Sequence, residues 1–245
     1  MALKHVQKTY EEYGKTDPLY AVLSQKHGKG NKWDLDEFFA TGREEIAEAL
    51  EYLAGLGLEI HKGRVLDFGC GAGRLTQALA GDFRQVVWVD ISYSMVECAR
   101  QHNKHGDRCH FVVNTSDDLA QFDDASFDFI YTNITLQHCP PEATTRYIAE
   151  FFRVLRPGGV ALFQVPSGKR HDPGTFGAWL YSLQRGTLKR FWKRLRGKPP
   201  VELHYVNQGI VEEIIEKCGG RLVEARQKGS SHSWRVSIFY AAVRD

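Results

Sequence analysis

The pattern of apolar and polar positions along the chain changes near residue 60. Before that point, residues 36–57 repeat apolar side chains at helical spacing, whereas the first 35 residues are polar and aromatic with weak periodicity. The apolar positions that share one face of the predicted helix are Phe38, Phe39, Ile46, Leu50 and Leu53. The pattern predicts an N-terminal helical region over residues 1–57, followed by a larger domain over residues 58–245.

From Arg64 onward, short apolar runs alternate with amphipathic stretches. VLDFG, VVWVDI, CHFVVN, FDFIYTNI and VALFQVP read as strands, and RLTQALAGDF, SMVECARQHNKH and residues 141–155 read as helices. Strands that alternate with helices at this spacing predict a parallel sheet covered on both faces. The segment RVLRPGG ends a helix with a proline and two glycines, which predicts a tight turn into the next strand.

The C-terminal part predicts a different connection. A helix over about residues 207–218 precedes two strand-like segments, RLVEARQ and WRVSIFYAAVR, which GSSHS separates. We therefore expect a doubly wound α/β fold with a mostly parallel, seven-stranded sheet and an antiparallel terminal hairpin. A helical insertion over residues 167–206 is expected after the fifth strand.

The composition indicates the class of protein and its cellular location, but it does not indicate a function. The 245 residues are 42% apolar and 25% charged with a formal net charge of +2, as in ordinary globular domains, so charge alone does not point to a polyanionic partner. The five cysteines show no CxxC pair or zinc spacing, which favours reduced thiols. The first residues lack the apolar run of a signal peptide, and no stretch approaches the length of a membrane span. We expect a cytoplasmic protein.

The stretch VLDFGCGAG carries the first chemical signal. A glycine-rich loop between a strand and a helix offers free backbone N–H groups, and glycine lets a ligand approach them closely. The spacing Gly69-x-Gly71-x-Gly73 differs from the G-x-G-x-x-G of dinucleotide sites. Asp90 ends the next strand, where a carboxylate can accept hydrogen bonds from both ribose hydroxyls. Taken singly, the glycines could form a simple tight turn and Asp90 a helix N-cap. Together they indicate a cofactor that contains a nucleoside.

The order of these motifs resembles that of the class I S-adenosylmethionine-dependent methyltransferases. The matching segments are VLDFGCGAG, Asp90 after the second strand, NTSDDL after the third, SFDFIYTNITLQH around the fourth and RVLRPGG before the fifth. The resemblance covers about residues 60–166, and the predicted hairpin agrees with the reversed last strand of this family.

The resemblance implies S-adenosylmethionine as the cofactor and assigns residues to it. Asp67 and the glycine loop would hold its methionine end, Asp90 its ribose and Ile91 its adenine. Ser116 and Asp117 would lie beside the adenine edge, and Asn133 would approach the methionine moiety or the acceptor. The residues assigned to the glycine loop are Gly69, Cys70 and Gly71. Arg43, in the region that in many such enzymes folds over the cofactor, could pair with its carboxylate, although a solvated helix arginine is the simpler reading.

Methyl transfer from a sulfonium needs mainly alignment and exclusion of water. A hydroxyl acceptor must also lose a proton, and His138, just beyond the fourth strand, is the candidate base. The alternative is a loop histidine bonded to backbone, and His204 and His232 are weaker candidates. The fourth motif reads Asn133-Ile134-Thr135-Leu136 where nucleobase methyltransferases carry a Pro-Pro pair. No acidic cluster suggests a metal site.

Residues 167–200 carry nine lysines and arginines against one aspartate, interleaved with aromatic and leucine residues. This pattern predicts a basic amphipathic lid that packs on the sheet. Alternatively, the basic residues could contact an anionic acceptor or lipid headgroups. An RNA partner is supported by this basic patch alone. We expect methyl transfer to oxygen, in preference to nitrogen, of a small molecule or a sugar in a glycan or natural product. The alternatives are an RNA or lipid-linked acceptor and a cofactor-binding partner protein without catalysis. The sequence leaves the oligomeric state open.

Overall fold

The computed structural model describes residues 2–169, 201–228 and 235–245. Its sheet has seven strands in the order β3-β2-β1-β4-β5-β7-β6. The strands are β1 Arg64–Phe68, β2 Gln85–Asp90, β3 Cys109–Val113, β4 Phe127–Thr132, β5 Leu155–Lys169, β6 Gly220–Lys228 and β7 Arg235–Arg244. β1 to β5 pair in parallel, whereas β7 runs antiparallel to both β5 and β6. The predicted doubly wound sheet with a terminal hairpin is confirmed.

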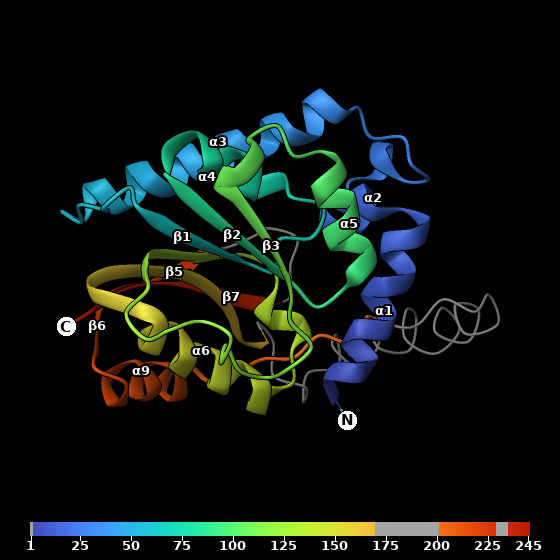
Figure 1. Ribbon diagram of the computed structural model, residues 1–245. Coiled ribbons are helices and arrows are strands. Elements are labelled where there is room, and N and C mark those ends of the chain that lie inside the picture. The colour runs from blue at the N-terminus through green and yellow to red at the C-terminus, as the bar shows by residue number, and fades with distance from the viewer. Residues whose placement is uncertain (1, 170–200, 229–234) are drawn as a thin grey trace.

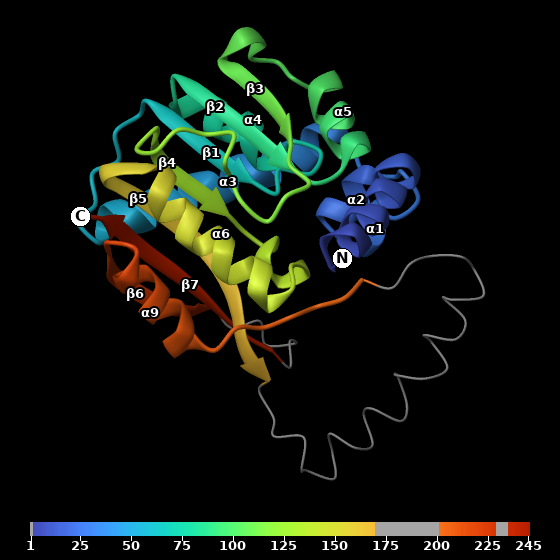
Figure 2. The same cartoon turned by 60° about the horizontal axis from the view of Figure 1, so that its bottom comes forward.

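Helices cover both faces of this sheet, as Figures 1 and 2 show. The longer helices are α1 Ala2–Thr16, α2 Pro18–Val22, α3 Leu35–Gly55, α4 Arg74–Asp82, α5 Tyr93–Gln101, α6 Pro141–Val154 and α9 Gln208–Lys217. Single turns η1, η2 and η3 span Lys26–Gly28, Gly106–Arg108 and Leu136–His138. Ile46 of α3 and Leu79 of α4 are buried in one core, and Phe151 of α6 and Ile215 of α9 are buried in the other. Each face of the sheet therefore has its own apolar core.

The predicted N-terminal helix corresponds to α3. Asp34 caps it by accepting a hydrogen bond from the Glu37 N–H at 2.9 Å, and Phe38, Ile46 and Leu53 are buried. The first 35 residues, which showed only weak periodicity, form α1, α2 and η1. α1 lies against α5, where the Glu11 carboxylate accepts hydrogen bonds from the Ser92 hydroxyl at 3.0 Å and the Ser94 N–H at 3.1 Å. The apolar residues Leu3, Val6 and Tyr10 nevertheless lie at helical spacing on α1, which the interpretation of weak periodicity overlooked.

The connection from α6 to β5 differs from the predicted tight turn. α6 ends at Val154, β5 begins at Leu155, and the pairing of β4 with β5 shifts between Phe127 and Phe129. Gly158, with φ of 75°, takes up this irregularity. The proline and the glycines therefore lie in an irregular stretch of β5, where residues 156–159 stand between the partners of Phe127 and Phe129.

β5 continues to Lys169, beyond its predicted end at Pro166. Residues 170–200 of the expected helical insertion lie outside the described residues, and residues 201–206 lead to α9 without regular structure. Within the described ranges, no helix is both long enough and apolar enough to cross a membrane.

Candidate cofactor and active site

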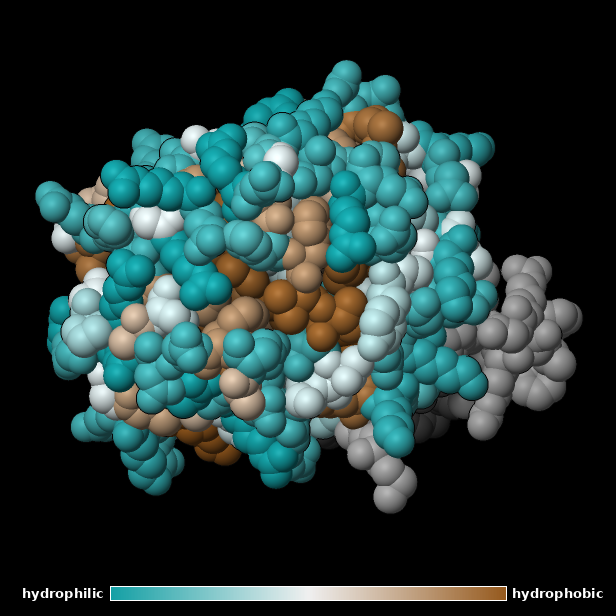
Figure 3. Space-filling view, viewed as in Figure 1, coloured by the Kyte–Doolittle hydropathy of each residue, from teal (hydrophilic) through white to brown (hydrophobic). Residues whose placement is uncertain are grey.

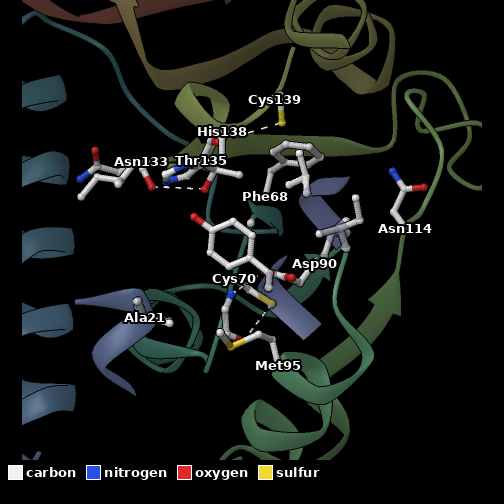
Figure 4. A pocket seen from close by; sticks show the side chains of 18 of the residues that line it. Ala21, Phe68, Cys70, Asp90, Met95, Asn114, Asn133, Thr135, His138 and Cys139 are labelled. Carbon is white, nitrogen blue, oxygen red and sulfur yellow. Dashed lines mark hydrogen bonds between the residues drawn. The ribbon is translucent and has the colours of Figure 1, made fainter. Parts of the chain in front are cut away.

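A pocket lies at the carboxyl ends of β1, β2 and β4, where ligands bind in open α/β sheets. It encloses about 920 Å³ of empty space, part of it open to solvent. Figure 4 shows Asn133, Thr135 and His138 on one side of the cavity, with Cys70, Asp90 and Met95 on another. The predicted site residues that line it are Gly69, Cys70, Gly71, Asp90, Ile91, Asn133 and His138. Asp67, Ser116 and Asp117 do not line it.

Helices α1 and α2 supply an apolar wall that the sequence did not reveal. Leu3, Val6 and Tyr10 of α1 and Ala21 and Val22 of α2 line the pocket. On the face shown in Figure 3, apolar surface lies between α5 and α6, next to α1. The N-terminal helices therefore complete the pocket of the central domain.

The glycine loop packs tightly against Thr135 and Val22, which also line the pocket. The Gly69 and Gly71 backbones have φ of 80° and 53°, which side-chain-bearing residues rarely adopt. A Cβ at Gly69 would stand 2.2 Å from Thr135 Oγ1, and one at Gly71 would stand 2.5 Å from Val22 Cγ2. The glycines thus allow two protein segments to approach the loop, in addition to presenting its backbone to the pocket.

The Asp90 carboxylate is oriented by backbone donors. The Gly71 N–H donates to Oδ2 and the Ser92 N–H donates to Oδ1, each at 2.9 Å. Burial raises the pKa of this carboxyl, although both hydrogen bonds oppose that rise. The cap of α5 is Ser92, whose side chain accepts from the Met95 N–H. Asp90 is therefore not the N-cap, and its remaining lone pairs are available at the pocket wall.

Asp67 lies beneath the loop, at 1% exposure. Its carboxylate accepts a hydrogen bond from the Thr76 hydroxyl, and burial raises its pKa to about 7. A direct contact of Asp67 with a cofactor stays a prediction. Its hydrogen bond to Thr76 joins β1 to α4, the helix that follows the loop.

At the end of β3, the pocket-lining residue is Asn114. Its amide bridges the following loop, donating to the Asp118 carbonyl at 2.8 Å and accepting from the Ser116 N–H at 3.2 Å. The Ser116 carbonyl accepts from the Tyr147 hydroxyl at 2.5 Å, and Asp117 pairs with Arg146. The cofactor roles predicted for Ser116 and Asp117 stay predictions.

A partly buried carboxylate on α3, Glu45, joins the glycine-loop helix to the end of β4. Its Oε2 lies 2.6 Å from Arg74 Nη2. Its Oε1 accepts from the Tyr131 hydroxyl at 2.9 Å and the Asn133 amide at 2.6 Å. Burial alone would raise the pKa of Glu45, but Arg74 and these hydrogen bonds hold it below its usual value. Glu45 is not among the residues predicted from the sequence. The signal in the sequence was Arg74, directly after the glycines, because a buried arginine needs a carboxylate partner.

Arg43, by contrast, is exposed on α3, as the solvated alternative expects. Phe38, Phe39 and Trp33 pack with Leu19 and Ala72 in a small buried cluster. These aromatic residues support the N-terminal wall from behind and do not line the pocket.

His138, at the end of η3, lines the pocket near α1. Its Nδ1 lies 3.2 Å from the Glu202 carbonyl oxygen, its Nε2 lies 3.1 Å from Gln137 Nε2, and its ring centroid is 5.3 Å from that of Tyr10. A carbonyl can only accept, so Nδ1 carries the proton and Nε2 holds the lone pair in the neutral ring. The role of general base stays a prediction.

The two other candidate bases are placed less directly. His204 binds Gln137 through its backbone N–H at 2.8 Å, and its imidazole lies 3.7 Å from the Glu202 carboxylate. It does not line the pocket. His232 lies outside the described residues.

Residues 65–159 match the family described as "Methyltransferase domain". The chain is 28% identical over 173 residues to a biotin biosynthesis bifunctional protein of Cellvibrio japonicus (strain Ueda107), covering 71% of this chain and 30% of that protein. It is 37% identical over 112 residues to a ubiquinone biosynthesis O-methyltransferase of Xanthomonas euvesicatoria pv. vesicatoria (strain 85-10), covering 45% of each. The chain thus spans less than half the length of these curated relatives.

Among solved structures, magnesium protoporphyrin IX methyltransferase from Synechocystis PCC 6803 with bound S-adenosylhomocysteine has a TM-score of 0.62 at 20% identity. That alignment covers 98% of each chain. At this identity the likeness concerns the fold. Residues 65–159 thus match a methyltransferase domain, and the chain shares its fold with a methyltransferase that binds S-adenosylhomocysteine.

Proposed function

We propose that this protein transfers the methyl group of S-adenosylmethionine to a hydroxyl oxygen of a small-molecule or sugar acceptor. The observation that carries the proposal is the pocket that brings the Gly69–Gly71 loop, Asp90 and His138 together at the carboxyl ends of β1, β2 and β4.

The pocket residues fit this cofactor by their chemistry. Asp90, already oriented by two backbone donors, would accept hydrogen bonds from the ribose hydroxyls. Ile91 and Met95 line the neighbouring part of the pocket and would pack on the adenine. The loop backbone from Gly69 to Gly71 would hold the methionine end. When bound, the sulfonium supplies an electrophilic methyl group, and α1 and α2 would limit the access of water.

The acceptor hydroxyl must give up its proton as the new C–O bond forms. His138 would take that proton on Nε2, since Nδ1–H is directed to the Glu202 carbonyl. The Gln137 amide now beside Nε2 would have to turn aside when the acceptor enters. Methyl transfer to oxygen is also what the name of the ubiquinone-pathway relative states for that protein.

The test must also distinguish two alternatives to a methyltransferase that acts on a small-molecule hydroxyl. The basic residues of 167–200 favour an anionic, lipid-linked or RNA acceptor, whose binding would weaken strongly with salt. A protein that binds the cofactor without catalysis would keep the pocket but release no product. A cytoplasmic location, in keeping with the reduced cysteines, is part of the proposal.

The test supplies S-adenosylmethionine with a phenol, an alcohol, a monosaccharide or a primary amine in separate reactions, and measures S-adenosylhomocysteine release and the mass of the methylated product. We expect release that depends on a hydroxyl acceptor and is lost in Asp90→Ala. The control variant is Asp107→Ala, an exposed aspartate in η2. Turnover with the amine alone would contradict oxygen as the acceptor atom. Cofactor binding without turnover across a broad panel would contradict catalysis.

A further inference from the structure

Ile134 has a backbone conformation that its residue type disfavours. Its φ is 65°, in the left-handed region that β-branched residues rarely enter. Asn31 and Ala125 are the other non-glycine residues with positive φ in the described ranges, and neither is β-branched. Strain of this kind persists where the surroundings impose it, and it concentrates at ligand sites.

Hydrogen bonds to neighbouring side chains hold Ile134 in this left-handed conformation. Its N–H donates to Gln164 Oε1 at 3.0 Å, and the Gln164 side chain is 4% exposed and donates in turn to Ser237 Oγ at 2.7 Å. On the other side, the Asn133 amide is bound to Glu45 Oε1 at 2.6 Å. The buried Gln164 of β5 and the partly buried Glu45 of α3 thus both bind the turn between β4 and η3.

This turn directs an apolar side chain into open space beside the loop. Ile134 is 42% exposed, yet it lines the pocket. Its neighbour Thr135 packs directly on the Gly69 backbone, so Ile134 is close to the part of the loop proposed to hold the methionine end. A polar residue would be expected at an exposed, strained position, because Asn and Gly enter this region at less cost.

Further exposed apolar residues follow on the segment bound to η3. Leu203 and Tyr205 are 39% and 56% exposed, and they flank His204, whose N–H binds the Gln137 carbonyl. Leu3 and Val6 of α1 line the same pocket. Apolar groups therefore accompany His138 on this side of the site.

We propose that Ile134 is a specificity-determining residue that contacts an apolar part of the methyl acceptor beside its accepting oxygen, and that Glu45 and Gln164 hold it there. The inference rests on the proposed methyl transfer and narrows its substrate class. The acceptor is a hydroxyl compound with an alkyl or aromatic portion next to the hydroxyl group, such as a substituted phenol, and not a bare sugar.

The test measures binding of 4-hexylphenol by calorimetry to the protein saturated with S-adenosylhomocysteine. Ile134→Asn tolerates positive φ and replaces the apolar contact with a smaller, polar side chain, and Ile134→Val is the matched control. We expect the wild type and the valine variant to bind the phenol within about twofold of each other, and the asparagine variant about tenfold more weakly or worse. We expect Ile134→Asn to melt at the wild-type temperature or above it, because the strain is relieved. Its affinity for S-adenosylhomocysteine should stay unchanged.

The proposal is overturned if 4-hexylphenol does not bind the loaded wild type, or if it binds all three proteins equally. A lower melting temperature for Ile134→Asn would also overturn it, because the side chain would then serve the packing of the fold. Failure of S-adenosylhomocysteine itself to bind the wild type is a separate result, which contradicts the proposed function.

Discussion

The carboxylate of Glu45 and the guanidinium of Arg74 meet at 2.6 Å, between the helix that precedes the sheet and the helix that follows the glycine loop. Gly42, one turn before Glu45, permits this approach, since a Cβ there would stand 2.2 Å from the Arg74 carbonyl oxygen. The two side chains are 19% and 5% exposed, so neither charge is well solvated if the pair is broken.

Glu45→Gln should therefore lower the free energy of unfolding by about 3 kcal/mol, because the buried charge of Arg74 loses its counter-charge. Urea unfolding measures the change. Glu44→Gln, at an exposed position on the same helix, is the control and should stay within about 0.5 kcal/mol of wild type. Equal stabilities for the two variants would show that the pair does not hold α3 to the loop.

Gly71→Val should abolish binding of S-adenosylhomocysteine. The new side chain would collide with Val22 of α2 and would occupy a residue with φ of 53°, so both the loop and the wall above it would move. Calorimetry gives the affinity, and hydrogen exchange over residues 18–22 reports the displaced helix. Gly81→Ala, where a Cβ meets nothing within 4 Å, should bind normally. Normal binding by the valine variant would place the cofactor elsewhere.

The buried carboxyl of Asp67 should make stability depend on pH. Its pKa of about 7 lies above the ordinary 3.8, so the folded state keeps a proton that the unfolded state releases. Stability is thus highest below about pH 4 with respect to this group, and it falls as pH rises toward 7, by at most about 1.4 kcal/mol per pH unit. Asp67→Asn should remove this component between pH 5 and 7. Parallel curves for both proteins in urea unfolding would contradict the assignment.

His138→Ala should keep its affinity for S-adenosylhomocysteine and lose about 10² to 10⁴ in turnover, because the acceptor hydroxyl loses its base. Turnover should depend on pH differently in the two proteins, because only the wild type carries the imidazole in the pocket. His204→Ala is the control, since its imidazole does not line the pocket. Turnover within about tenfold of wild type, or a shared pH profile from 5.5 to 9, would leave alignment alone to explain the rate.

The sheet and much of the pocket could be predicted from the sequence because local patterns encode them. Apolar runs at the strands and the glycines before α4 lead directly to β1, β2 and Asp90, which the structure places together. Glu45 could not be singled out, since α3 carries other glutamates at similar spacing and its partners lie 29 to 88 residues away. The wall made by α1 and the left-handed Ile134 depend on packing between distant segments, which no local pattern records.

The most direct test of the account is calorimetric titration of the protein with S-adenosylmethionine, beside Asp90→Ala and the control Asp107→Ala. One cofactor should bind per chain, and Asp90→Ala should weaken binding by about 1.5 to 3 kcal/mol because it removes charge-assisted hydrogen bonds to the ribose. Asp107→Ala should bind as the wild type does. An unchanged affinity in a folded Asp90→Ala protein, or no binding by the wild type, would contradict the central claim that this pocket holds the methyl donor.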